Sequence, residues 1–310
     1  MGTVLSSKQR GAGASQLGGS NQVARLSSSA HEAWLQALDG VLPSPGHPNR
    51  ARWQSYHGNA LLRGELAAEI LKPLLPPRGR VLDIGCGTGG ASVALARCGT
   101  RVVALDVDRA RLRATRALAQ AESAAVDMLR ADGIRLPLGD STCDGVLLQD
   151  VIEHVASPRA LLCEVARVLK SGGAMFLSTP NRWSPFNALA DPHWGLPVVG
   201  VLPGNAVARL TNARRLAAAG RSSVPALLSL RRLRRLTKEA GLIMSFANRA
   251  AARFICTEPR AALCARHHLR LAKWARRAGV LQWLPRLVND RWGVWNWWLN
   301  PTWYIIGRKP

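Results

Sequence analysis

A glycine-rich turn between a strand-like and a helix-like segment is the feature that most restricts how this chain can fold. The turn lies in Val81-Leu-Asp83-Ile-Gly85-Cys-Gly87-Thr-Gly89-Gly90, after a short apolar run at 80–84 and before a helical pattern at 91–97. Its glycines at 85, 87 and 90 have the spacing of a nucleotide-binding turn, where glycine permits a tight backbone path. The segment predicts the first strand–turn–helix unit of a parallel sheet, with a ligand at the carboxyl end of the strand.

Further strand and helix patterns alternate along the chain. They predict strands at 101–105, 145–149, 174–178, 242–246 and 302–306, and helices at 61–75, 109–121, 158–169, 229–240 and 260–277. Strands separated by helices of this length form βαβ units, whose sheet is covered by helices on both faces. We therefore predict an α/β, Rossmann-like fold with a central, mostly parallel sheet.

Charge distinguishes the ligands that this turn can bind. A nicotinamide dinucleotide would bring an anionic pyrophosphate next to Asp83, which like-charge repulsion disfavours. S-adenosylmethionine has no phosphate and carries an ammonium and a sulfonium, for which the Asp83 carboxylate is a suitable counter-charge. The turn therefore predicts S-adenosylmethionine as the cofactor, and a NAD-dependent oxidoreductase stays a more distant alternative.

With these residues, the sequence resembles the class I S-adenosylmethionine-dependent methyltransferases, and more narrowly the type 11 domain family that includes ubiquinone-biosynthesis O-methyltransferases. A carboxylate at the end of the second strand suits a ribose, because it accepts two hydrogen bonds from a diol. The resemblance implies four groups of cofactor-binding residues: the loop Asp83, Gly85, Gly87 and Gly89; Asp106 for the ribose hydroxyls; Asp132 and Gly133 for the adenine; and Gln149 for the methionine part.

The run Asp150-Val-Ile-Glu153-His154 follows the predicted strand at 145–149, on the side where a methyl acceptor would bind. Its i, i+3, i+4 spacing predicts that all three polar side chains share one helix face. Such a face can supply a general base, a divalent metal site, or only the packed and capped start of a helix. In the quinone O-methyltransferases a similar run is associated with metal. We predict His154 and Glu153 as catalytic residues and assign no metal site.

The positive charge is concentrated in the last third of the chain. The formal net charge is +23, and residues 181–310 hold 22 basic and 4 acidic residues, whereas residues 79–180 hold 12 and 11. We predict a methyltransferase domain at 31–310, with a cofactor-binding core at 51–181 and basic, Trp-rich insertions at 182–230 and 249–300 on the acceptor side. Residues 1–30, rich in Gly, Ser and Ala, are predicted to be a disordered leader, and organelle targeting by this segment stays open.

Several function classes are excluded by composition. No apolar run reaches eighteen residues, and the six cysteines include no C-x-x-C pair, so a spanning helix, a disulfide framework and a zinc cluster are not predicted. We predict a cytoplasmic enzyme that transfers a methyl group to a small acceptor, lipophilic or anionic, most readily at oxygen. Basic residues next to tryptophans also suit peripheral contact with a membrane. One alternative is a nucleic-acid methyltransferase, although this sequence has no N-P-P-Y-type motif after the strand at 145–149. The other is a membrane-binding module that retains the fold.

Overall fold

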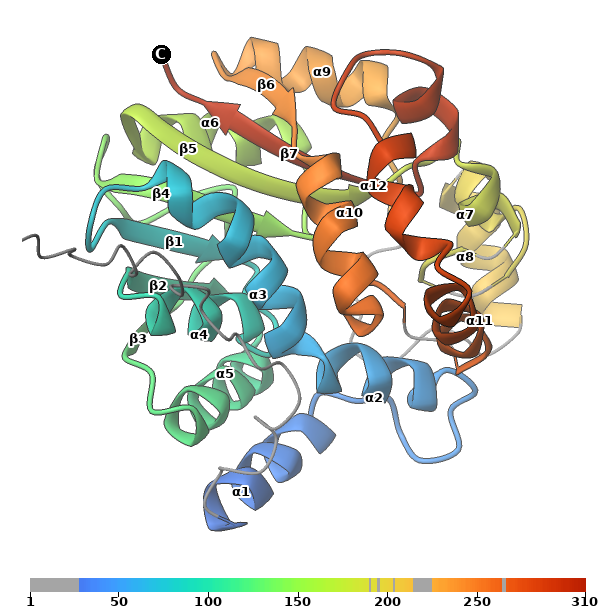
Figure 1. Ribbon diagram of the computed structural model, residues 1–310. Coiled ribbons are helices and arrows are strands. Elements are labelled where there is room, and N and C mark those ends of the chain that lie inside the picture. The colour runs from blue at the N-terminus through green and yellow to red at the C-terminus, as the bar shows by residue number, and fades with distance from the viewer. Residues whose placement is uncertain (1–27, 190, 194–195, 203, 214–224, 264–265) are drawn as a thin grey trace, which may run out of the picture.

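A seven-stranded sheet organises the computed structural model of the protein (Figure 1). The structure describes residues 28–189, 191–193, 196–202, 204–213, 225–263 and 266–310, so the predicted leader lies outside the described residues except for 28–30. The strand order is β3-β2-β1-β4-β5-β7-β6. The strands are β1 (Arg80–Ile84), β2 (Arg101–Asp106), β3 (Val126–Arg130), β4 (Cys143–Gln149), β5 (Leu169–Pro180), β6 (Ile243–Phe246) and β7 (Thr302–Arg308).

The sheet is parallel from β3 to β5 and becomes antiparallel at β7. β1 pairs in parallel with β2 and β4, so that their carboxyl ends meet at one edge. β7 runs antiparallel to both β5 and β6. The observed sheet confirms the predicted α/β, mostly parallel fold, and it places the ends of β1, β2 and β4 together at the ligand-binding edge expected for this topology.

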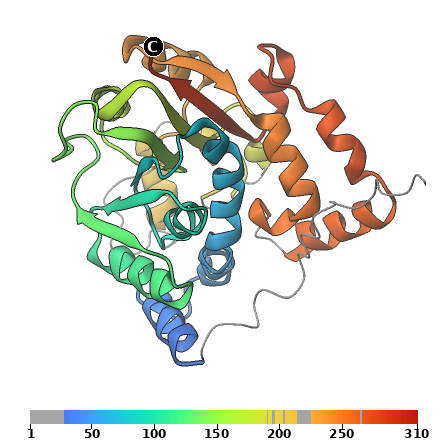
Figure 2. The ribbon, with the colours of Figure 1, turned by 60° about the vertical axis from the view of Figure 1, so that its left-hand side comes forward.

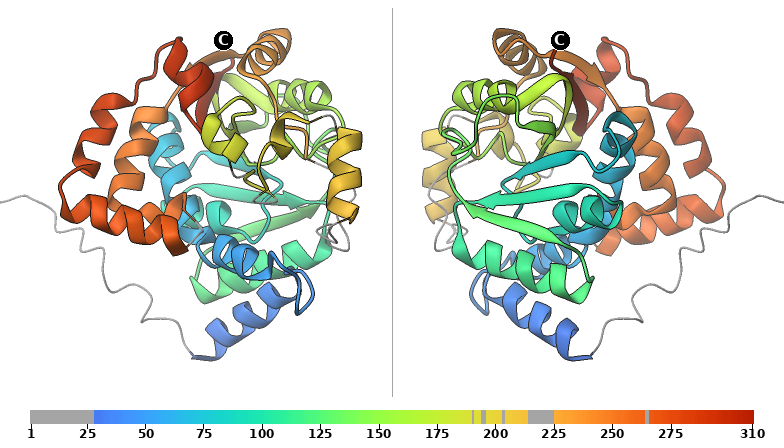
Figure 3. Two further views of the ribbon diagram at one scale, coloured as in Figure 1. Left: turned by 90° about the vertical axis from the view of Figure 1, so that its right-hand side faces the viewer. Right: turned by 90° about the vertical axis from the view of Figure 1, so that its left-hand side faces the viewer.

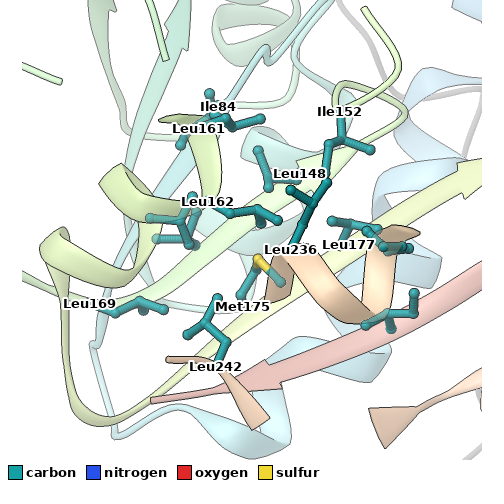
Figure 4. Close-up of a cluster of buried hydrophobic side chains, with 14 of the residues drawn as sticks. Ile84, Leu148, Ile152, Leu161, Leu162, Leu169, Met175, Leu177, Leu236 and Leu242 are labelled. Carbon is teal, nitrogen blue, oxygen red and sulfur yellow. The ribbon is translucent and has the colours of Figure 1, made fainter. Parts of the chain in front are cut away.

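Helices cover both faces of the sheet (Figures 2 and 3). One face carries α3 (Ala60–Leu71), α4 (Gly90–Arg97), α5 (Arg109–Ala121) and α10 (Asn248–Thr257), and the other carries α6 (Pro158–Val168) and α9 (Leu230–Glu239). Successive strand residues alternate between the two faces: Leu147 packs with α3 and α4, whereas Leu148 packs with α6 and α9 (Figure 4). Continuous apolar strands are thus explained by burial on both sides.

Helices α3 and α4 approach each other through two glycines. A Cβ added to Gly64 would lie 2.2 Å from the Gly90 carbonyl oxygen, and one added to Gly90 would lie 2.0 Å from that of Ala60. Any side chain at either position would push the helices apart, since real Cβ atoms do not approach backbone so closely. This close contact holds α3 directly beside the turn that follows β1.

The remaining helices lie near the chain's amino end or in the connections next to β6 and β7. They are α1 (Ser28–Asp39), α2 (Arg50–Gly58), α7 (Pro185–Leu189), α8 (Gly204–Ala213), α11 (Arg266–Arg277) and α12 (Leu284–Leu287). α10 packs against α3, and α12 and α11 lie outside α10 (Figures 2 and 3). Within the described residues, no helix combines the length and apolar character needed to cross a membrane.

One predicted element needs correction, and several observed elements were not predicted. The single basic helix predicted at 260–277 is wrong: a 3₁₀ turn occupies Pro259–Ala261, and α11 begins only at Arg266. The proline explains part of this, because it cannot donate a backbone hydrogen bond inside a helix. β3 was not predicted, because its residues Val-Asp-Met-Leu-Arg do not keep the apolar–polar alternation of a half-buried strand. The helices that were not predicted are α1, α2, α7, α8, α10 and α12.

Candidate active site

The turn after β1 requires glycine at three predicted positions. Gly85, Gly87 and Gly89 have φ values of 68°, 58° and 84°, a left-handed backbone that strains other residues. A Cβ on Gly85 would also lie 2.7 Å from a methyl carbon of Val151, and one on Gly89 would lie 2.7 Å from the Thr115 methyl group. The glycines let the chain double back from β1 into α4 and leave backbone exposed to the cavity above the sheet.

Asp106 ends β2 beside this turn and is only 2% exposed. One carboxylate oxygen, Oδ2, accepts a hydrogen bond from Gly87 N–H at 3.1 Å, and the other accepts from Asp108 N–H at 3.0 Å. A carboxylate has about four acceptor positions, so two remain for further donors. Asp106 also lines the cavity, which fits its predicted contact with a ribose diol.

Asp83 is a buried carboxyl at the root of the same turn. It is 1% exposed and accepts a 2.5 Å hydrogen bond from the Ser92 hydroxyl. Burial, with a smaller effect of the nearby Asp106 charge, raises the pKa of Asp83 to about 7 against the opposing effect of the hydrogen bond from Ser92. A cation next to this group would stabilise its charged form, so the site favours an electropositive ligand over a phosphate.

The other predicted cofactor residues line the same cavity. Asp132 accepts a hydrogen bond from Ile134 N–H at 3.1 Å, and Gly133 sits against Ile84, where a Cβ would lie 2.7 Å from a methyl carbon. The Gln149 side chain donates to the backbone carbonyl of Arg63 at 3.1 Å, which ties the end of β4 to α3. All three residues border the cavity. The structure therefore brings the eight predicted cofactor residues to one edge of the sheet.

The run at 150–154 departs from its predicted shape. Residues 150–156 form turns and not a helix, and Asp150 has a φ of 54°. The Asp150 carboxylate binds other side chains: it accepts from Arg63 at 2.7 Å, Tyr56 at 3.1 Å and Ser178 at 2.8 Å. The prediction that one helix face carries all three residues is wrong, because the left-handed residue breaks the helical path after β4.

Asp150 instead joins the amino-terminal helices to the sheet. Arg63 from α3 also donates to the Tyr56 hydroxyl, and its guanidinium lies 3.5 Å from the centre of the Tyr56 ring. Sequence reasoning missed both residues. Neither stands in a motif, and their partner Asp150 is 87 and 94 positions away along the chain.

Glu153 and His154 meet a third residue that the sequence did not indicate. His193 follows α7, and its ring lies 5.0 Å from the His154 ring, centroid to centroid, at an interplanar angle of 84°. The Nε2 atom of His193 is 4.0 Å from Glu153 Oε1, and the His193 backbone N–H donates to Asp191 at 2.8 Å. The only available signal was a histidine in a Pro-rich segment, which is not specific.

Burial dominates the chemistry of Glu153. The residue is 2% exposed, and its Oε2 accepts a hydrogen bond from the Thr179 hydroxyl at 3.1 Å. Its Oε1 has no hydrogen-bond partner among the described residues, at a depth where such atoms are usually paired. Burial, together with the nearby Asp150 charge, raises the pKa of Glu153 to about 8. At neutral pH the carboxyl therefore holds a proton, and a positive charge at Oε1 would favour its ionised form.

The three side chains can also hold a metal ion. Glu153, His154 and His193 each offer one ligand atom, and these atoms all lie within 4.8 Å of one another. Two imidazoles and one carboxylate suit a first-row divalent cation. The prediction without a metal site was based on residues 150–154 alone and did not include His193.

One cavity of about 2240 Å³ joins the cofactor turn to this cluster. Its walls include Gly85 and Asp106 on one side and Glu153, His154 and His193 on another. Apolar residues from the segment between β6 and β7 complete it, namely Ala272, Ala275, Leu281, Leu284 and Val288. A nucleoside-bearing ligand and a second, partly apolar molecule can therefore occupy one continuous space.

Comparison with known proteins places the central part of the chain in a family. Residues 82–177 match the methyltransferase domain model. Ubiquinone biosynthesis O-methyltransferase of Parvibaculum lavamentivorans is 31% identical over 174 residues, which are 54% of this chain and 65% of that protein. The same enzyme of Xanthomonas oryzae pv. oryzae is 38% identical over 113 residues, 36% of this chain and 47% of that protein. The chain thus spans about half to two thirds of the length of these relatives.

Among solved structures, the match to the [4+2]-cyclase SpnF covers 91% of this chain and 93% of the SpnF chain, at 18% identity and a TM-score of 0.49. The matched domain includes β1, β2 and β4, the strands whose ends carry the cofactor turn, Asp106 and Gln149. Through this domain, the chain is similar to S-adenosylmethionine-dependent methyltransferases, and residues 82–177 form a methyltransferase domain.

Proposed function

We propose that the protein transfers a methyl group from S-adenosylmethionine to an oxygen atom of a lipophilic, hydroxylated acceptor. The observation that carries the proposal is the continuity of one cavity between the cofactor turn and the Glu153, His154 and His193 cluster. The names of the relatives, ubiquinone biosynthesis O-methyltransferases, support oxygen as the acceptor atom. The matched segments cover only part of each protein, so we infer the acceptor class from this chain's cavity.

The cofactor-binding residues fit S-adenosylmethionine by their chemistry. The free acceptor positions of Asp106 suit ribose hydroxyls, Asp132 suits an exocyclic amine, and Asp83 supplies a counter-charge to the ammonium and sulfonium. When bound, S-adenosylmethionine supplies an electrophilic methyl group. The protein's own contribution is to hold the acceptor oxygen in line with that group and to exclude water.

Proton transfer falls to the cluster opposite the cofactor turn. As the acceptor oxygen gains the methyl group it loses its proton, and His154 accepts that proton at an imidazole nitrogen. Glu153 and His193 lie against His154 and stabilise the positive charge that it acquires. If a divalent cation occupies the three side chains, it lowers the pKa of a hydroxyl near it, and the same residues serve as its ligands.

The acceptor class follows from the cavity wall. Among the described residues of α11 and of the segment 281–288, those that line the cavity are apolar: Leu269, Leu271, Ala272, Ala275, Leu281, Leu284 and Val288. Hydrocarbon that binds against such an apolar wall is removed from water, which stabilises the complex by about 25 cal/mol per Å² of buried apolar surface. We therefore propose an acceptor with a polar, hydroxylated head at His154 and an apolar body toward α11 and α12.

The experiment is a transfer assay with methyl-labelled S-adenosylmethionine and two acceptor sets, alkylated catechols and water-soluble catechols. We expect label in the alkylated set, and a loss of about a hundredfold or more in turnover for His154→Gln with unchanged cofactor affinity. The matched control is His31→Gln, which changes a histidine of α1 outside the cavity wall. Transfer by His154→Gln at the wild-type rate would remove His154 from the proposal, and labelling of neither set would remove the acceptor class.

A further inference from the structure

The segment between β6 and β7 carries an unusual surface. Residues 259–300 include eight basic residues and one acidic residue, Asp290. On α11, Arg270, Lys273 and Arg277 are exposed and lie along one stripe at helical spacing. Among the described residues, no ion pair involves these three side chains. The stripe therefore presents uncompensated positive charge to solvent.

Large apolar side chains border this stripe and are also exposed. Leu271 and Trp274 of α11 are 62% and 63% exposed, and Trp283 and Leu287 further along are 53% and 62% exposed. Soluble proteins rarely expose so many large apolar groups in one segment without a partner. The Arg286 guanidinium lies 4.3 Å from the centre of the Trp283 ring, so basic and aromatic groups alternate along this surface.

The opposite side of the same segment faces the cavity. Ala272 and Ala275, on α11 between the exposed positions, line the cavity, and Ala272 is only 8% exposed. Leu271 both lines the cavity and is exposed, which places it at the rim. α11 therefore separates the cavity from the outer surface, and Figures 1 and 3 show it on the outside of the molecule.

We infer that this face, defined by α11 and residues 281–287, docks on an anionic lipid bilayer, with the rim of the cavity at the membrane surface. Charge complementarity favours anionic lipid headgroups, which attract each nearby Lys or Arg. Exposed aliphatic residues such as Leu271 and Leu287 favour a bilayer over nucleic acid, because they gain from entering the acyl region and offer no stacking platform for bases. The inference concerns binding and does not depend on methyl transfer.

The test is co-sedimentation of the full chain with vesicles of phosphatidylcholine alone or with 30% phosphatidylglycerol. We expect binding to the anionic vesicles that falls with added salt. The triple variant Arg270→Gln, Lys273→Gln, Arg277→Gln should lower the partition constant by roughly a hundredfold, since each basic residue contributes about fivefold. Trp274→Ala should lower it further without changing net charge.

The matched control removes the same charge elsewhere. Arg109, Arg113 and Arg116 form an exposed stripe on α5, and their replacement by glutamine should leave vesicle binding within about twofold of the wild type. Circular dichroism and cofactor binding show whether each variant is folded. Equal losses in the α5 and α11 variants would overturn the inference. So would a single-stranded RNA shift that depends on α11 while vesicle binding does not.

Discussion

At the scale of single residues, Asp83 is a group whose ionisation the fold controls directly. It is buried, and the pKa of its carboxyl is raised to about 7. The cofactor-free protein therefore holds Asp83 protonated below pH 7, whereas the unfolded chain ionises it near pH 4. The native state binds this proton more tightly, so the contribution of Asp83 to the free energy of unfolding falls as pH rises from about 4 to about 7.

Cofactor affinity should show the opposite trend. A bound cation favours the ionised Asp83 carboxylate, so below pH 7 binding must release a proton. We expect the dissociation constant for S-adenosylmethionine, measured by calorimetry, to fall by up to about tenfold per pH unit between pH 5.5 and 7 and then to level off. Asp83→Asn cannot ionise and should bind weakly with a flat profile. An equal slope in this variant and in the wild type would show that another group is responsible.

At the scale of elements, the contact of α3 with α4 sets where the amino-terminal helices meet the cofactor turn. Gly64→Ala places a methyl group 2.2 Å from the Gly90 carbonyl oxygen. Helix propensity alone would make this change stabilising by about 1 kcal/mol. We expect overpacking to outweigh it and to lower the free energy of unfolding by roughly 1–3 kcal/mol in urea titrations.

Gly58→Ala in α2 is the matched control for this prediction. A Cβ at Gly58 would meet no atom within 4 Å, so the substitution should be neutral or stabilising by up to about 1 kcal/mol. Similar stability changes in the two variants would mean that α3 and α4 can separate at little cost. In that case α3 would not be rigidly placed by Gly64.

How far apart interacting residues stand along the chain explains which parts of the site could be predicted from the sequence. Asp83, Gly85 and Gly87 stand within one short turn, so their spacing was sufficient to place them. The pairing of Arg63 with Asp150 spans 87 positions and depends on how α3 packs, which no local pattern records. Asp150 itself was misplaced, because its left-handed backbone is set by its contacts with Arg63, Tyr56 and Ser178 and not by helix propensity.

At the scale of the whole molecule, the cavity joins parts that are far apart in the chain. Its lining extends from Trp53 in α2, through the turn after β1, to Val288 after α12 and Tyr304 in β7. A ligand that fills this space contacts the sheet edge, the amino-terminal helices and the segment between β6 and β7 together. Binding should therefore stabilise the protein as one cooperative unit.

We expect S-adenosylmethionine at a hundredfold excess over its dissociation constant to add about 2.7 kcal/mol to the free energy of unfolding. For a chain of this size, the gain corresponds to a rise in Tm of roughly 4 °C in calorimetry, and NADH at the same concentration should cause none. Asp106→Ala loses charge-assisted hydrogen bonds worth about 1.5–3 kcal/mol, so its ligand-induced shift should fall below half of the wild-type value. Asp127→Ala, an exposed carboxylate on the neighbouring strand β3, should keep the full shift. A rise in Tm with NADH would contradict the assignment of this sheet edge to a cationic methyl donor. So would an undiminished ligand-induced shift in Tm for Asp106→Ala.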